Sequence, residues 1–187
     1  MSLLELRSVA CVRGGRLLFD GLDLVLEPGG AALVTGPNGA GKSSLIRIAA
    51  GLLAAAAGTV GRSAPAALAD EGLALDPKLP LARAIGFWSR LDGTDCADAM
   101  AGMGLTGIAQ VPVRMLSTGQ RKRAALARVL ASGAPLWLLD EPANGLDSDG
   151  QARLEGAMAA HRAGGGAILA ASHQPLALPG AALVRLG

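Results

Sequence analysis

The sequence predicts an α/β fold: a mostly parallel sheet with flanking helices and an inserted helical segment. Short apolar runs without polar–apolar alternation are typical of strands covered on both faces, and they occur at residues 31–36, 135–142 and 166–173. Helical patterns separate these runs, and the middle of the chain has helical character without strand signals. We expect one domain over residues 1–187, with a core of residues 1–74 and 132–187 and a helical subdomain of about 75–131.

Local signals place the remaining elements in order. Gly21–Gly30 alternates leucine with other residues and ends in a Pro-Gly turn, which indicates a strand. Ser43–Leu53 has a helical pattern, and the apolar segment Ala181–Gly187 predicts a last strand. Ser117 is a good N-cap for the Ala/Leu-rich helix that follows it, although Gly119 in the first turn costs about 1 kcal/mol relative to alanine.

Composition excludes several classes of protein. Apolar residues make up 51% of the chain, which argues against disorder, and the aromatic fraction of 2% requires a core of alanine, leucine and valine. The net charge of +2 is too small to indicate a nucleic-acid partner. Cys11 and Cys96 have no CxxC or framework spacing, so we expect two reduced cysteines buried as small apolar side chains.

No segment has the pattern of a membrane span. The charge-free stretch 163–184 contains glycines, prolines and a histidine, and predicts strand, loop and strand; the run 48–61 is too short to cross a bilayer. Glu5 and Arg7 near the start argue against a signal peptide. We expect a soluble chain that reaches a membrane only through a partner.

A phosphate-binding loop is the strongest functional signal. The segment GPNGAGKS fits G-x-x-x-x-G-K-[ST] and lies between an expected strand and an expected helix, the context that the motif requires. Backbone N–H groups and the helix N-terminus would surround phosphate oxygens, Lys42 would reach the β- and γ-phosphates of a nucleotide, and the Ser43 hydroxyl would bind Mg²⁺. The expected ATP-binding residues here are Gly36, Pro37, Asn38, Gly39, Ala40, Gly41, Lys42, Ser43 and Ser44.

Two acidic residues and a histidine follow later strands. Asp140 ends an apolar strand, where it could hold Mg²⁺, and Glu141 beside it is a candidate to orient and deprotonate the attacking water. His173 ends another strand at the same sheet edge, where open α/β sheets bind ligands. A solvated acidic pair and a structural histidine are the alternatives, but the upstream loop favours catalytic roles for Lys42, Glu141 and His173.

The helix that begins at Ser117 offers a second anion site. One nucleotide already has its own loop, so this helix could instead face the ATP of a second copy in a two-fold dimer. The alternative is a nucleic-acid-binding helix, which the Ala/Leu-rich continuation and the low net charge disfavour.

Together these motifs resemble the ATP-binding-cassette (ABC) ATPases over essentially the whole chain. The resemblance implies a P-loop NTPase core, the helical subdomain and an N-terminal antiparallel β region. It also implies ATP and Mg²⁺ as cofactors, His173 as the switch histidine, and a dimer of two copies. The signature that contacts the partner's ATP would be Ser117, Thr118, Gly119 and Gln120, and the D-loop would be Asn144, Gly145, Leu146 and Asp147.

Within that family, the chain looks most like the ATPase subunits of the haem exporter of cytochrome c maturation. Arg13–Phe19, Gly133–Asp147 and His161–Leu176 carry this likeness. It implies a peripheral protein on the cytoplasmic side of the inner membrane, bound to an integral membrane subunit of that system. Hydrolysis would be linked to release of a haem-loaded chaperone, with no direct haem binding and no nucleic acid.

The chain departs from the family pattern at three positions. Arg13 stands where family members usually carry an aromatic residue that stacks on adenine; an arginine plane can also stack on a base. Glu71 stands at the Q-loop position, which usually holds a glutamine that touches Mg²⁺, and a carboxylate could still ligate the metal. Thr118 replaces the commoner glycine of the signature.

Three other functions stay open at this point. The first is an ATPase subunit of another small ABC transporter. The second is a soluble cassette ATPase acting on DNA or ribosomes, although the chain has no coiled-coil insertion, tandem cassette or basic extension. The third is a non-hydrolysing scaffold gated by ATP, which the intact loop, acids and histidine disfavour.

Overall fold

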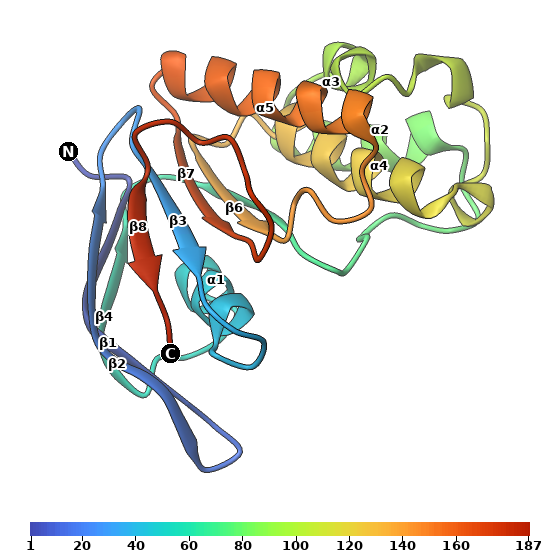
Figure 1. Cartoon of the computed structure of the whole chain (residues 1–187). Coiled ribbons are helices and arrows are strands. Elements are labelled where there is room, and N and C mark those ends of the chain that lie inside the picture. The colour runs from blue at the N-terminus through green and yellow to red at the C-terminus, as the bar shows by residue number, and fades with distance from the viewer.

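The computed structural model describes all residues from Met1 to Gly187, arranged around two β-sheets (Figure 1). A three-stranded antiparallel sheet has the order β2-β1-β4, and a five-stranded sheet has the order β5-β6-β7-β3-β8. The strands are β1 (Leu4–Arg13), β2 (Arg16–Leu26), β3 (Ala31–Thr35), β4 (Ala57–Arg62), β5 (Ala66–Ala69), β6 (Leu136–Asp140), β7 (Ala167–Ala171) and β8 (Ala182–Arg185). The helices are α1 (Lys42–Ala50), α2 (Leu81–Asp92), α3 (Ala97–Gly102), α4 (Thr118–Ala131) and α5 (Ser148–Ala163), with short 3₁₀ turns at Thr106–Ile108 and Val113–Met115.

Every pair of neighbouring strands in the larger sheet is parallel, as the apolar runs predict. Side chains along its central strands alternate between two hydrophobic cores. On β6, Leu136 and Leu138 pack in the core that includes α1 and the antiparallel sheet, whereas Trp137 and Leu139 pack in the core that includes α2 to α5. Both faces of the sheet are therefore covered, and its strands are continuous apolar runs for that reason.

The antiparallel sheet and α1 form one side of the molecule (Figure 1). β1 pairs with β2 from Leu4↔Leu26 to Arg13↔Arg16. These two strands are longer than those of the parallel sheet, and their hairpin projects beyond it (Figure 1). Phe19 on β2 is buried in the same core as α1. The hairpin thereby carries Arg13 to the neighbourhood of the loop that precedes α1.

The helical region of residues 81–131 packs on the other face of the parallel sheet, together with α5. The predicted N-cap is confirmed: the Gln120 backbone N–H donates to Ser117 Oγ at 3.2 Å, and the Ser117 N–H donates to Gln120 Oε1 at 2.9 Å. This reciprocal pair satisfies two N–H groups at the helix start. Gly119 is explained by its neighbour, because a Cβ there would lie 3.0 Å from the Gly145 carbonyl oxygen.

Sequence patterns located β3, β6, β7 and β8 but not β1, β4 or β5. β1 is interrupted by charged residues, β4 contains two glycines, and β5 consists of three alanines and one leucine. None of these patterns is a strong strand signal. Cys11 is buried as expected, whereas Cys96 is only partly buried, because it precedes the short surface helix α3. None of the helices combines the length and apolar character that crossing a membrane would require.

Candidate functional site

A cleft of about 640 Å³ lies where the parallel strands end at their carboxyl edge. β3, β7 and β6 are adjacent, and β5 lies next to β6, so the segments that follow all four strands converge there. This edge is where open α/β sheets bind ligands. Its lining residues are Arg13, Leu18, Asn38, Gly39, Gly41, Lys42, Ser43, Ser44, Glu71, Glu141, Asn144 and His173. The cleft thus unites most of the sequence-predicted binding and catalytic residues.

The phosphate-binding loop wraps around the N-terminus of α1. Lys42 is only 7% exposed, and its Nζ donates to the carbonyl oxygens of Gly36 at 2.8 Å and Pro37 at 3.2 Å. The ammonium is therefore folded back onto the loop that it belongs to. A buried cation beside a helix N-terminus makes this part of the cleft suitable for an anionic ligand.

Asp140 is the most deeply buried acid of the site, at 3% exposure. Burial raises the pKa of its carboxyl; the Ser43 side chain lowers it, Glu141 raises it and Lys122 lowers it, in that order of size. Its Oδ1 has no hydrogen-bond partner in the chain. An unpartnered buried carboxylate oxygen costs free energy unless a cation or donor reaches it, so Asp140 and the Ser43 hydroxyl fit a hard divalent metal ion such as Mg²⁺.

Glu141 and His173 form a direct pair at the mouth of the cleft. Glu141 Oε2 lies 2.8 Å from His173 Nδ1 and accepts a hydrogen bond, at 3.2 Å, from the His173 backbone N–H. Both interactions use the same oxygen, so Oε1 is left for a water molecule. Glu141 has a φ of 47°, a left-handed conformation that costs of order 1 kcal/mol or more and commonly marks functional sites.

Two residues that depart from the expected pattern also line the cleft. Arg13 comes from the β1–β2 hairpin, and Glu71 comes from the segment that follows β5. Both residues therefore lie at the same cleft as the phosphate loop, and their roles there stay predictions.

The profile of the ABC transporter family matches residues 19–144. The chain is 61% identical to the cytochrome c biogenesis ATP-binding export protein CcmA of Sphingopyxis alaskensis, over 95% of this chain and 93% of the relative. It is 58% identical to the CcmA of Novosphingobium aromaticivorans, over 91% of this chain and 88% of that protein. The chain belongs to the ABC transporter family, in the CcmA group. A CcmA of Zymomonas mobilis is 52% identical over 92% of this chain and 79% of that protein.

Solved structures show the same ABC ATPase fold. The ATP-binding subunit of an ABC transporter superposes with a TM-score of 0.84 at 21% identity, covering 92% of this chain and 80% of that one. The ATP-binding cassette of an ABC transporter in its ADP conformation superposes with a TM-score of 0.73 at 20% identity, covering 94% and 82%. Both likenesses concern the fold, and they agree with its antiparallel sheet, parallel sheet and helical region.

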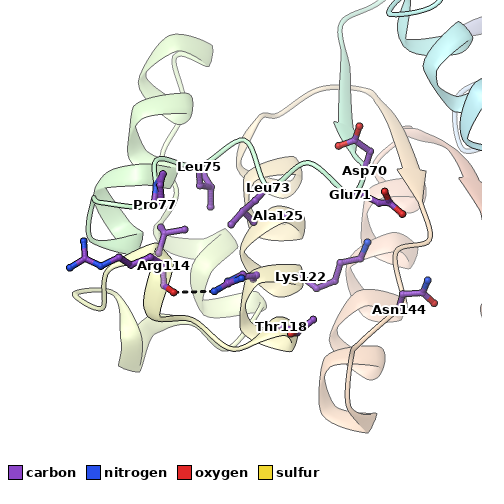
Figure 2. Close-up of a pocket in the computed structure, with 12 residues that line it drawn as sticks. Asp70, Glu71, Leu73, Leu75, Pro77, Arg114, Thr118, Lys122, Ala125 and Asn144 are labelled. Atoms are coloured by element: carbon purple, nitrogen blue, oxygen red, sulfur yellow. Dashed lines mark hydrogen bonds between the residues drawn. The ribbon is translucent and has the colours of Figure 1, made fainter.

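The residues expected to form the ABC signature, Ser117–Gln120, do not line the cleft. Thr118 lines a second pocket, of about 570 Å³, between α4 and the segment after β5 (Figure 2). The expected D-loop, Asn144–Asp147, runs beside the expected signature, since Gly119 packs against the Gly145 carbonyl, and Asn144 lines both pockets. Asp147 caps α5 by accepting the Gly150 N–H at 2.8 Å. Signature and D-loop therefore form one surface next to the cleft.

Sequence reasoning missed one residue that lines the cleft and one that lies beside it. Leu18 lines the cleft from β2, and no sequence signal distinguishes it from other strand leucines. Lys122 donates from Nζ to the Asp140 backbone carbonyl at 3.3 Å. The crowding of basic residues after Ser117 could have drawn attention to it, but the pattern does not say which of them turns inward.

Proposed function

We propose that this chain is the ATP-binding and ATP-hydrolysing subunit of the ABC transporter for haem export in cytochrome c biogenesis. The ABC ATPase family and the CcmA relatives support an ATP-driven transporter subunit. The observation that carries hydrolysis is the cleft that joins the Lys42 loop and the Glu141–His173 pair, with the buried Asp140 beside the Ser43 side chain. In that system, ATP hydrolysis is linked to release of the haem-loaded chaperone.

ATP binding begins at the phosphate loop. The triphosphate lies against the backbone N–H groups of residues 39–44, and Lys42 exchanges its two loop carbonyls for β- and γ-phosphate oxygens. Because the ammonium already lies at the loop, this exchange needs only a side-chain rotation. The Arg13 guanidinium lines the same cleft and stacks on the base.

Ser43 and Asp140 would hold Mg²⁺. Their oxygens are of the type that this ion prefers, and Asp140 Oδ1 is unpartnered. When bound, Mg²⁺ neutralises charge that develops on the phosphate oxygens. Glu71 lines the same cleft and supplies a further carboxylate near that position.

Glu141 orients and deprotonates the attacking water. Its Oε2 is fixed by the ring and the backbone N–H of His173, so the proton of the water passes to Oε1. The rigid pair keeps the carboxylate in one orientation. The water attacks the γ-phosphorus in line with the bond to the β–γ bridging oxygen, which breaks, and ADP leaves with that oxygen.

A second copy completes the site. None of the expected signature residues Ser117–Gln120 lines the chain's own cleft, which suits contact with the ATP of a partner copy in a two-fold dimer. Closure and opening of that dimer would move an integral membrane subunit of the cytochrome c maturation system. The chain would then be a peripheral protein on the cytoplasmic side of the inner membrane.

The decisive experiment measures size by light scattering for Glu141→Gln with Mg²⁺, with and without ATP, beside ATP turnover of the wild type. The variant should bind ATP and shift from monomer to dimer, while turnover falls about 10²–10⁴-fold because the base is lost. Unchanged turnover would remove Glu141 from the role of base. A variant that binds ATP but never dimerises would contradict a dimer formed by this chain alone.

A further inference from the structure

Lys122 lies at an unusual concentration of negative charge. It projects from α4, and four carboxylates stabilise its cation. In decreasing order of their effect on the Lys122 pKa, they are those of Asp140, Glu141, Asp70 and Glu71. Burial works against the charge, and the net result is a lowered pKa of the Lys122 ammonium. Two of these four acids, Asp140 and Glu141, already have expected roles in metal binding and catalysis. The other two, Asp70 and Glu71, could be the groups that the Lys122 ammonium compensates.

Three of the four acids have other partners. Asp70 pairs with Arg47 of α1 at 3.7 Å, Glu141 pairs with His173, and Asp140 is buried beside the Ser43 side chain. Glu71 forms no ion pair and no side-chain hydrogen bond in the structure. Lys122 forms no ion pair either, and its ammonium donates only to the Asp140 carbonyl. One carboxylate and one ammonium are therefore without a direct charged partner.

These two unpaired groups line the same pocket. Figure 2 shows Lys122 extending from α4 along the pocket wall toward Glu71, which descends from the segment after β5. Glu71 also lines the nucleotide cleft, whereas Lys122 does not. Glu71 thus lies between the two cavities, and Lys122 lies at the cavity that does not bind the nucleotide.

We propose that Lys122 is the positioning residue for Glu71: it compensates the carboxylate that this chain carries at the Q-loop position and holds it at the wall of the nucleotide cleft. The proposal rests on the proposed function, because it concerns the same ATP site. An uncompensated Glu71 would add repulsion to the triphosphate beside Asp140 and Glu141. Lys122 lowers that repulsion without entering the cleft, and its bond to the Asp140 carbonyl ties α4 to the end of β6.

The effect of Lys122 on ATP binding can be measured as a ratio of two dissociation constants. Free ATP carries two more negative charges than its magnesium complex, so loss of a nearby cation weakens binding of free ATP more. The readout is the dissociation constant of ATP in EDTA divided by that in excess Mg²⁺, measured by calorimetry at low salt. Lys122→Met should raise this ratio about threefold or more, with part of the Coulomb energy lost to screening because Glu71 is exposed.

A double-mutant cycle decides whether Glu71 is the group that Lys122 serves. Glu71→Gln alone should lower the ratio, and in the Glu71→Gln background Lys122→Met should change the ratio less than about twofold, because the carboxylate that Lys122 serves is already gone. Lys122→Arg keeps the cation and should leave the ratio near the wild-type value. Lys78→Met is the matched control: an exposed lysine in the loop before α2 that lines neither pocket, and its loss should not change the ratio.

Additive effects of the two substitutions, or an Arg variant that behaves like Met, would overturn the proposal. If Lys122→Met fails to fold, Glu71→Gln remains, and an unchanged ratio in that variant would overturn it equally. A failure of the proposed function is distinguishable, because it would appear in the wild type as no Mg²⁺-dependent ATP binding, or as binding that Lys42→Ala does not weaken.

Discussion

Replacement of Gly36 by alanine tests the close contact between the start of the phosphate loop and the C-terminal segment. Gly36 has a φ of 148°, and a Cβ there would lie 2.2 Å from the Leu186 carbonyl oxygen. Real Cβ atoms essentially never approach a neighbour so closely. A rotation cannot relieve the overlap, because the atom in the way is backbone.

The cost has two parts. A non-glycine residue in this backbone region costs about 1–3 kcal/mol. Moving the Leu186 backbone away also weakens its N–H bond to the Thr35 carbonyl, 2.9 Å long, which contributes about 1 kcal/mol. We expect Gly36→Ala to lower the free energy of unfolding by about 2–4 kcal/mol, or about 4–16 °C in melting temperature for a chain of this size.

Urea unfolding of Gly36→Ala beside Gly39→Ala separates the two parts. Gly39 is in the same loop with a φ of 82°, but a Cβ there would meet nothing within 4 Å. Its substitution should therefore cost only the backbone strain, about 1–2 kcal/mol. Equal losses in both variants, with unchanged m-values, would refute the overlap with Leu186 as the cause.

Three further changes have defined outcomes. Lys42→Ala should weaken ATP binding about 10–100-fold, since one charged group with phosphate bonds is lost; undiminished affinity in a nucleotide titration would count against the proposed cradle. Asp147→Ala removes the N-cap of α5 and should cost about 0.5–2 kcal/mol in urea unfolding, whereas a neutral result would show that the bond to Gly150 is replaced by water. His161 stacks on Trp137 with ring centroids 3.9 Å apart, and burial lowers the pKa of its imidazole. Its neutral form is favoured in the folded chain, so stability is present above the unfolded pKa of about 6.5 and falls as pH drops below it. His161→Phe keeps the stack and should flatten stability between about pH 7 and 5; an unchanged pH profile would show that other groups dominate.

Patterns of neighbouring residues predicted the strands and the helix start that depend on short-range interactions. The apolar runs became β3, β6, β7 and β8 because strands covered on both faces can contain almost no polar residues. The helix after Ser117 begins where predicted, because a capping box is a short-range interaction. Asp140 and His173 each stand at the end of a predicted parallel strand. Because parallel strands end at one edge of the sheet, the sequence predicted that both residues would lie near the phosphate loop.

By itself, then, the sequence determined the fold class, the phosphate loop and the acidic strand end, because each depends on residues close together in the chain. Only the tertiary structure decided contacts between distant segments. It brought Gly119 against the Gly145 carbonyl, gave Glu141 its left-handed backbone beside His173, and placed Glu71 and Lys122 at one pocket. Such contacts depend on strand order and packing, and a charge in the sequence does not reveal whether it turns to solvent or toward an unpaired acid.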